Sequence, residues 1–130
     1  MDFYKCKHCG NIITYLHASG VKVLCCGEEM MKLTANTTDA ATEKHIPAIS
    51  QTGNLVHIQV GDVIHPMEDV HYIEWIALET TDGQVQIKYL HPHEAPAATF
   101  CLVDGDKIAR VYAYCNLHGL WVKDMALSSF

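Results

Sequence analysis

The chain has 130 residues, an apolar fraction of 49% and a formal net charge of −6 with neutral histidines. This apolar fraction is typical of a packed globular protein and excludes a disordered chain. The negative charge argues against non-specific binding to nucleic acid, and no stretch reaches the roughly eighteen apolar residues of a membrane span. We therefore expect one ordinary domain, or one domain with a small module, whose partners include neither nucleic acid nor a membrane.

The composition is unusual in having six cysteines and nine histidines. The first residues, Met1 to Lys5, contain no apolar signal region, which predicts a cytoplasmic location. Cytoplasmic cysteines serve more often as metal ligands or free thiols than as disulfides. The positions of these residues therefore carry most of the information about function.

Residues 1–36 form the first predicted unit, which contains two pairs of cysteines. The pairs are Cys6 and Cys9, in a Cys-x-x-Cys turn followed by glycine, and Cys25 and Cys26. Asn11 to Val23 predicts a hairpin with its turn at Ser19-Gly20, which would bring the two pairs together. Four thiolates from one short segment make a closed tetrahedral site.

The spacing of these cysteines leaves iron and zinc open, because four thiolates suit both metals. A module below about 40 residues usually needs a metal or a partner chain to fold, so homodimerisation is a natural further support. The other reading is a redox pair of Cys6 and Cys9, with the remaining two cysteines as bystanders.

A polar segment from Asn36 to Thr42 predicts a linker, so residues 37–130 are expected to form the second domain. Pro47 disfavours helix at the preceding residue, which places His45 in an extended or looped segment. From Ala48 on, alternating and β-branched segments are separated by turn signals every eight to twelve residues or so. This pattern predicts about seven strands in an antiparallel β-sandwich.

Further candidate ligands lie beside the predicted turns of this second domain. They are His45, His65, His71, Cys115 and His118. The loops of a β-sandwich cluster at its two ends, so residues far apart in sequence can converge there. Structural zinc sites are almost always closed and four-coordinate. A five-ligand set therefore favours a six-coordinate metal with one open, catalytic position.

Taken in order along the chain, these motifs resemble desulfoferrodoxin, the two-iron class of superoxide reductase. The resemblance covers essentially the whole chain and rests on Cys6-x-x-Cys9, Cys25-Cys26, Glu43-Lys44-His45, His65, His71 and Cys115-x-x-His118. It implies a desulforedoxin-like module followed by an immunoglobulin-like β-sandwich. It also implies that one iron is held by the four N-terminal cysteines. A second iron would take the four histidines equatorially and Cys115 axially.

The reaction implied by the resemblance is the one-electron reduction of superoxide to hydrogen peroxide, which detoxifies a reactive oxygen species. Glu43 is implied as the sixth ligand of the oxidised catalytic iron. Lys44 would add a positive charge near the open position, where we expect it to steer the anion and order a proton-donating water. The four-cysteine iron would be an electron relay or a structural centre, and an external protein such as rubredoxin would donate the electron.

Other functions and residues are weighed against this hypothesis. A zinc-ribbon-like binding module or a rubredoxin-like electron carrier leaves the histidines and Cys115 without a shared role, and a thiol–disulfide oxidoreductase would hold no metal. Cys101 lies in a strand pattern and is predicted to be a core residue. Trp75 and Trp121 are also assigned to the core, whereas His91 and His93 are placed on the surface.

Overall fold

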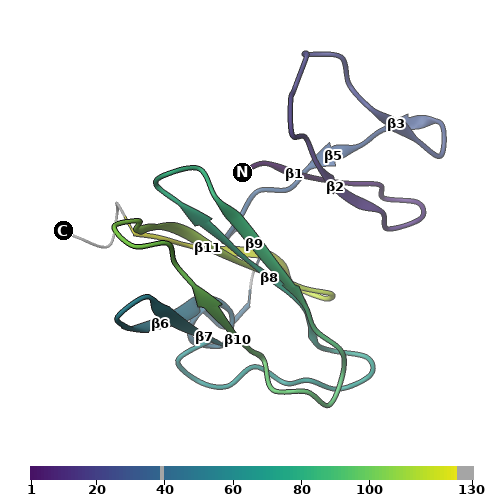
Figure 1. The fold of residues 1–130 in the computed structure, drawn as a ribbon. Coiled ribbons are helices and arrows are strands. Elements are labelled where there is room, and N and C mark those ends of the chain that lie inside the picture. Colours follow the sequence, from purple (N-terminus) through teal and green to yellow (C-terminus); the bar gives the residue numbers. More distant parts are fainter. Residues whose placement is uncertain (39, 126–130) are drawn as a thin grey trace. The chain divides into compact units, whose positions relative to one another are not determined.

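The structure is a computed structural model that describes residues 1–38 and 40–125. Contacts between its residues divide the chain into two compact units, Met1–Thr34 and the part from Ala35 onward. Nearly all of its regular structure is β (Figure 1).

The first unit contains five short strands. They are β1 (Phe3–Lys5), β2 (Ile12–Thr14), β3 (Leu24–Cys25), β4 (Glu28–Glu29) and β5 (Met31–Lys32). Strand β1 pairs antiparallel with β2 on one side and β5 on the other, while β3 and β4 form a separate ribbon. The Cys-x-x-Cys turn joins β1 to β2, Cys25 is the last residue of β3, and Cys26 lies in the turn between β3 and β4.

The predicted hairpin over Asn11 to Val23 is wrong, because only Ile12–Thr14 of that segment is a strand and it pairs with β1. The turn that carries Cys6 and Cys9 closes this pairing, with the amide of Cys6 donating to the carbonyl of Asn11 at 2.9 Å. A short loop has a low closure entropy, so the local pairing wins over the longer hairpin.

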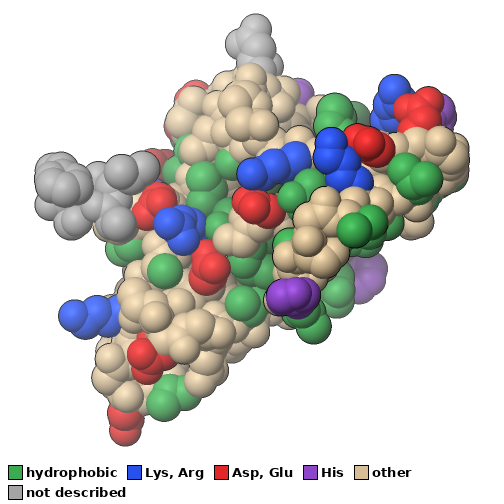
Figure 2. Space-filling view, turned by 90° about the horizontal axis from the view of Figure 1, so that it is seen from above, with side chains coloured by type: hydrophobic (Ala, Val, Ile, Leu, Met, Phe, Trp, Pro, Cys, Tyr) green, Lys and Arg blue, Asp and Glu red, His purple; other side chains and the backbone are tan. Residues whose placement is uncertain are grey.

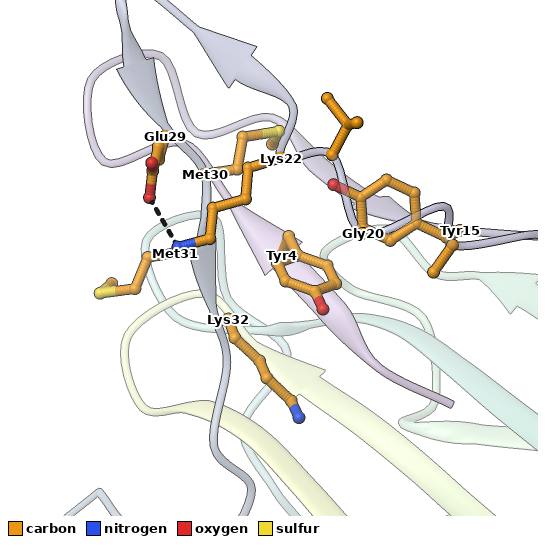
Figure 3. Close-up of a pocket in the computed structure, with 10 residues that line it drawn as sticks. Tyr4, Tyr15, Gly20, Lys22, Glu29, Met30, Met31 and Lys32 are labelled. Atoms are coloured by element: carbon orange, nitrogen blue, oxygen red, sulfur yellow. Dashed lines mark ion pairs between the residues drawn. The ribbon is translucent and has the colours of Figure 1, made fainter.

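A cavity of about 500 Å³ lies within the first unit (Figure 3). The rings of Tyr4 and Tyr15 line it and meet edge to face, with centroids 5.0 Å apart. Lys22 and Glu29 form an ion pair of 3.2 Å across its wall. No cysteine contributes to its lining.

The second unit contains one turn of helix and seven strands within residues 40–125. They are α1 (Thr42–His45), β6 (Pro47–Thr52), β7 (Leu55–Val60), β8 (Ile73–Thr80), β9 (Val85–Tyr89), β10 (Ala97–Cys101), β11 (Ile108–Cys115) and β12 (Gly119–Asp124). The strands form two antiparallel sheets, in the orders β10-β7-β6 and β12-β11-β8-β9. The predicted antiparallel, immunoglobulin-like β-sandwich is therefore confirmed.

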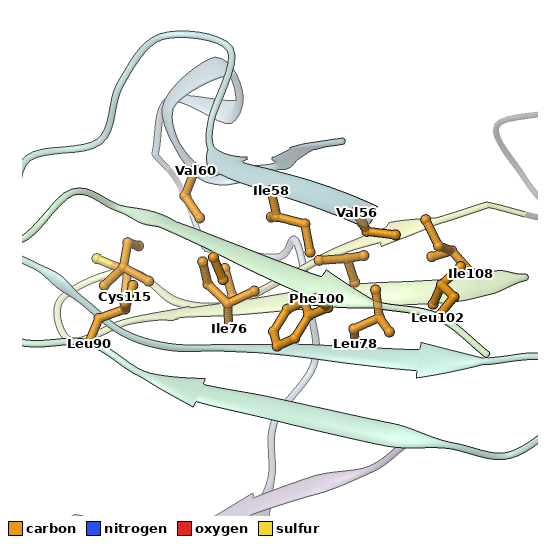
Figure 4. Close-up of a cluster of buried hydrophobic side chains, with 14 residues drawn as sticks. Val56, Ile58, Val60, Ile76, Leu78, Leu90, Phe100, Leu102, Ile108 and Cys115 are labelled. Atoms are coloured by element: carbon orange, nitrogen blue, oxygen red, sulfur yellow. The ribbon is translucent and has the colours of Figure 1, made fainter. Parts of the chain in front are cut away.

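Both sheets contribute apolar side chains to one core (Figure 4). Strand β7 alternates between exposed and buried residues, so Val56, Ile58 and Val60 face inward. Ile76 and Leu78 of β8 are fully buried opposite them. Burial of each such side chain stabilises the fold by roughly 1.5–3 kcal/mol. Cys115 belongs to the same core, where it lies at one end.

The strand register shows which end of the sandwich carries the candidate ligands. In one sheet, the first residue of β6 pairs with the last residue of β7. In the other sheet, Cys115 at the end of β11 pairs with Ile73 at the start of β8 and with Gly119 at the start of β12. The segments with the five candidate ligands are attached to these strand ends, so the fold brings them together.

His45 differs from the prediction, because it is the last residue of the helical turn α1 rather than part of an extended segment. The helix does end where Pro47 requires, with Ile46 in the extended region at φ −68° and ψ 126°. The turn packs directly on the chain after β7, where the amide of Val63 donates to the carbonyl of Glu43 at 2.9 Å.

The surface carries charges of both signs. Basic and acidic side chains lie close together on the face shown in Figure 2, rather than in separate patches. Cys101 is exposed, which corrects its assignment to the core: it points outward because its neighbours Phe100 and Leu102 point inward. Among the described residues, no helix combines the length and apolar character that a membrane crossing needs.

Candidate metal centres

Four cysteines of the first unit form the first candidate centre. Their sulfur atoms all lie within 4.8 Å of one another, at Cys6, Cys9, Cys25 and Cys26. The sulfurs of Cys9 and Cys25 are 3.5 Å apart, too far for a disulfide bond. Four sulfurs at about 2.3 Å from a central ion would be about 3.8 Å from each other, so this spacing suits a tetrahedral metal site.

A backbone amide and a side-chain amide donate hydrogen bonds to sulfur atoms of this centre. The amide of Cys9 lies 3.5 Å from the sulfur of Cys6, and the Asn11 side chain donates to the sulfur of Cys25 at 3.6 Å. The hydrogen bond from Cys9 is the main reason that the pKa of Cys6 is lowered to about 6. Hydrogen bonds with Cys6 and Cys9 raise the pKa of Cys26 to about 12. Crowded thiols resist joint ionisation, which a bound cation would relieve.

The second candidate centre lies at one end of the β-sandwich. Its members are His45, His65, His71, Cys115 and His118, whose ligand atoms lie within 4.8 Å of one another. The four imidazoles form a closed cycle in which each ring meets the next edge to face. The centroid distances around the cycle are 4.6 Å (His45–His65), 4.7 Å (His65–His71), 5.1 Å (His71–His118) and 4.9 Å (His118–His45).

Two nitrogen–nitrogen distances match those between neighbouring corners of a square around one ion. Nε2 of His45 lies 3.1 Å from Nε2 of His65 and 3.1 Å from Nδ1 of His118. With metal–nitrogen bonds of about 2.1 Å, neighbouring corners of a square plane are about 3 Å apart. His45 therefore occupies the corner between His65 and His118.

Two of the rings have their tautomers set by backbone carbonyls. Nδ1 of His45 donates to the carbonyl of Ala41, and Nδ1 of His65 donates to that of Pro66, each at 2.7 Å. In a neutral ring the other nitrogen, Nε2, then carries only a lone pair. The contact between the two Nε2 atoms has no proton to share, so a cation between them is the simplest way to stabilise it.

Burial favours the neutral form of three of these imidazoles, which is the form that binds metals. Burial is the main reason that the pKa of His65 is lowered to about 4. It also lowers the pKa values of His45 and His71 below the ordinary histidine value. Nε2 of His71 is buried and has no hydrogen-bond partner within residues 1–38 and 40–125, as expected of a ligand atom.

Cys115 supplies the only thiol of this group. It is fully buried, and its sulfur lies 3.9 Å from Nδ1 of His118. Burial raises the pKa of the Cys115 thiol, while hydrogen bonds from the amides of His118 and Leu117 act in the opposite direction. These two amides would stabilise a thiolate once a cation offsets the cost of burial.

Trp121 is a residue of the site that the sequence reasoning assigned only to the core. It is buried, as predicted, but its indole stacks on the ring of His45, with centroids 4.8 Å apart. Its Nε1 also donates to the carbonyl of His118 at 3.1 Å. The signal that could have indicated this is its position three residues after His118, on the strand that follows directly.

Lys44 and Glu43 lie on α1 beside His45, and both are exposed. Burial is the main cause of the low pKa values of His45 and His71, but the positive charge of Lys44 lowers both further. Lys44 is therefore close enough for its field to reach the imidazoles. The carboxylate of Glu43 is not among the ligand atoms that the structure brings together. His91 and His93 are exposed, as predicted.

The residues of both candidate centres therefore fit metal ions. Four sulfurs suit iron or zinc, and four imidazoles around a square with one thiol suit a metal of higher coordination number than structural zinc. His71 and His118 are only partly buried, unlike the other three members, so the group is open on one side.

Comparison with known proteins gives the family. The family model described as "Desulfoferrodoxin" matches residues 37–124, and the one for the "Desulfoferrodoxin, N-terminal domain" matches residues 1–33. A desulfoferrodoxin of Nitratidesulfovibrio vulgaris is 49% identical over 120 residues, covering 92% of this chain and 93% of its own. A desulfoferrodoxin homolog of Archaeoglobus fulgidus is 47% identical over 121 residues, covering 93% of this chain and 94% of its own.

A solved structure gives the same result. The superoxide reductase of Treponema pallidum is 36% identical and aligns with a TM-score of 0.79, covering 95% of this chain and 98% of its own. The two groups of cysteine and histidine side chains are consistent with the two iron sites that the resemblance to this family implies. By its sequence, its fold and these two groupings, the chain belongs to the desulfoferrodoxin family.

Proposed function

We propose that this chain is a superoxide reductase, an iron-dependent enzyme that converts superoxide, one electron and two protons into hydrogen peroxide. The observation that carries the proposal is the closed cycle of four imidazoles with a buried thiol beside it. The family and the superoxide reductase from Treponema pallidum support it.

In the proposed catalytic centre, the imidazoles of His45, His65, His71 and His118 and the thiolate of Cys115 would hold the iron. Bound iron supplies the electron by changing between its ferrous and ferric states. The chain contributes rigidly held donors, because the carbonyls of Ala41 and Pro66 fix the orientation of two rings. Rings held in this way need little reorganisation when the charge of the site changes.

The amides that donate to Cys115 control how strongly its sulfur gives up electron density. Hydrogen bonds from Leu117 and His118 spread part of the thiolate charge into the backbone. They also fix the sulfur at the end of the core, where water is excluded. The residue therefore holds a stable thiolate next to the imidazoles without exposing it to oxidation.

Charged residues on α1 act at the open side of this centre. Lys44 attracts the anionic substrate and holds a water that donates a proton to the product. Glu43 would be the sixth ligand of the oxidised form, because a carboxylate is attracted to a more highly charged metal ion. Both residues are exposed beside the buried His45, so they can move toward the open side without disturbing the core.

The first unit, residues 1–36 in our proposal, holds a second iron through its four cysteines. Four protein ligands leave this iron no open position, so it transfers electrons or stabilises the unit rather than binding superoxide. Residues 37–130 carry the catalytic centre. We further propose a cytoplasmic homodimer that detoxifies superoxide and receives its electrons from an external redox protein such as rubredoxin.

The substitution Cys115→Ser tests the proposal. It should abolish the sulfur-to-iron absorption of the oxidised catalytic centre and most of the reaction with pulsed superoxide, because the axial thiolate is lost. The absorption of the four-cysteine centre should remain. Cys101→Ser is the matched control, since Cys101 is an exposed cysteine outside both groups. An unaltered catalytic-centre spectrum in Cys115→Ser would rule out the assigned ligand set.

A further inference from the structure

We propose that Asn116 is a positioning residue that holds His71 in place for the metal. The inference rests on the proposed iron site, but it concerns a residue to which neither the motifs nor the proposed reaction gives a role. Asn116 is the second residue of the Cys115-to-His118 turn, so it lies between two proposed ligands and reaches toward a third.

The hydrogen bonds of Asn116 enclose His71 on both sides. Its side-chain Oδ1 accepts from the amide of Tyr72 at 2.9 Å, and its Nδ2 donates to the carbonyl of Val70 at 3.1 Å. Its own amide donates to the carbonyl of Tyr72 at 3.2 Å. One asparagine thus binds the residue before His71 and the residue after it.

These bonds continue the pairing of two strands beyond its last regular residue. Cys115 pairs with Ile73, after a register shift at Tyr114 and Cys115. Asn116 then carries the contact one residue further to Tyr72 with its backbone, and on to Val70 with its side chain. The turn with Cys115 and His118 is therefore tied to the loop with His71.

Within residues 1–38 and 40–125, His71 lacks the hydrogen bond to a backbone carbonyl that orients the rings of His45 and His65. The rings of His45 and His65 are each oriented by a hydrogen bond to a backbone carbonyl. Neither ring nitrogen of His71 has such a bond within the described part of the chain, and its Nε2 is buried without a partner. Its position must therefore come from its backbone, and Asn116 holds the backbone on either side.

The chemistry of asparagine suits this task, because one amide group offers an acceptor and donors to two peptide groups at once. Alanine offers neither. Aspartate keeps an acceptor for the amide of Tyr72 but cannot donate to the carbonyl of Val70 when ionised. Loss of an outer partner of a metal ligand typically weakens metal binding by roughly 10–100-fold.

The experiment compares the full-length chain with Asn116→Ala and Asn116→Asp. Cobalt(II) is added to each metal-free protein, its affinity for the histidine centre is measured, and the hyperfine-shifted ring protons of the bound histidines are counted by NMR. Only histidine ligands give these ring signals, so the four-cysteine centre does not interfere. Asn54→Ala is the matched control, because the Asn54 side chain also bridges two loops, to Asp104, at the other end of β7.

We expect Asn116→Ala to raise the dissociation constant for cobalt about 10–100-fold. The signals of His71 should broaden or disappear while those of His45 and His65 persist. Asn116→Asp should give a smaller loss of affinity, and it decides the matter if the alanine variant does not fold. Asn54→Ala should bind cobalt as the unchanged protein does, whatever its melting temperature.

Two results would overturn the inference. The first is that Asn116→Ala binds cobalt as tightly as the protein without substitution and shows the signals of four bound histidines. If only Asn116→Asp folds, the same result for that variant would overturn the inference. The second is an equal loss of all four histidines, which would indicate general loosening rather than a role at His71. Failure of the proposed function would be a different result. If the protein without substitution binds cobalt through four histidines but does not reduce superoxide with iron, the proposed function is wrong and the role of Asn116 is unaffected.

Discussion

At the scale of single residues, the candidate catalytic centre is prepared by hydrogen bonds that lie outside it. The carbonyls of Ala41 and Pro66 select which nitrogen of His45 and His65 carries the proton. Each free Nε2 then points at the same place, which is costly without a cation because the two lone pairs face each other at 3.1 Å. The fixed tautomers of these two buried rings therefore favour binding of a positive ion between them.

Lys44→Ala tests whether one exposed charge guides the substrate. Lys44 adds a positive field at His45 and His71, in a protein whose formal net charge is −6. Its removal should slow the reaction with superoxide by roughly threefold to tenfold at low salt. Because screening removes the same attraction, the rate should also depend less on ionic strength. Stopped-flow or pulse-radiolysis rates at several salt concentrations measure both effects.

Lys107→Ala is the control for this prediction. Lys107 is also exposed, and it precedes β11 at the end opposite Cys115, so its removal makes the same change in net charge far from the catalytic centre. Equal rates and equal salt dependence in Lys44→Ala and Lys107→Ala would show that Lys44 does not guide the anion.

At the scale of secondary-structure elements, the position of α1 depends on the absence of a side chain at Gly61. A Cβ at Gly61 would lie 2.5 Å from the carbonyl oxygen of Glu43 and 2.9 Å from that of Ile46. Both are backbone atoms, so no side chain can move aside to make room. The close approach of α1 to the end of β7 therefore requires glycine.

Gly61→Ala should displace α1 together with His45. Overpacking of this kind typically costs about 1–3 kcal/mol, which denaturant unfolding would measure. The metal affinity of the histidine centre should fall as well, because one ligand moves. Gly53→Ala is a useful control: Gly53 has φ +61°, and a methyl group there would meet no atom within 4 Å, so alanine strains the backbone without touching α1. If both variants lose stability but neither loses affinity, α1 is not held by this contact.

The sequence predicted the elements whose signals are local and strong. Alternation identified β7, and the turn signals separated the strands of both sheets. The hairpin over Asn11 to Val23 was wrong because the nearby Cys-x-x-Cys turn offers β2 a closer partner in β1. The helical turn at His45 was missed because four residues are too few for a periodic pattern.

The cysteines and histidines of the candidate site could be predicted from the sequence, but the residues that hold them in place could not. Cysteine and histidine are rare enough that their spacing marks them as candidate ligands. Trp121 and Asn116 act through a stacked ring and through backbone groups, and neither contact leaves a distinctive pattern in the sequence. Cys101 was misplaced because the apolar segment around it hides which face of β10 it occupies.

At the scale of the whole molecule, the two units differ in how much core they possess. The second unit buries a cluster of apolar residues between two sheets. Within residues 1–34, the buried apolar side chains are those of Phe3, Cys6 and Met30. Burial of so few apolar side chains does not offset the conformational entropy lost when roughly thirty residues become ordered. A metal ion bound by the four cysteines is therefore needed to stabilise the first unit.

Metal removal should therefore unfold the first unit and spare the second. After chelation under reducing conditions, we expect amide hydrogen exchange in β1, β2 and β5 to become as fast as in an unfolded chain. The amides of β7, β8 and β11 should stay protected, since the core between them contains no candidate metal ligand except Cys115. Cys9→Ser should give the same pattern without a chelator, because it removes one of four ligands. Continued protection of β1 and β2 in the metal-free protein would contradict the argument and would mean that the apolar contacts of Phe3 and Met30 suffice to fold the unit.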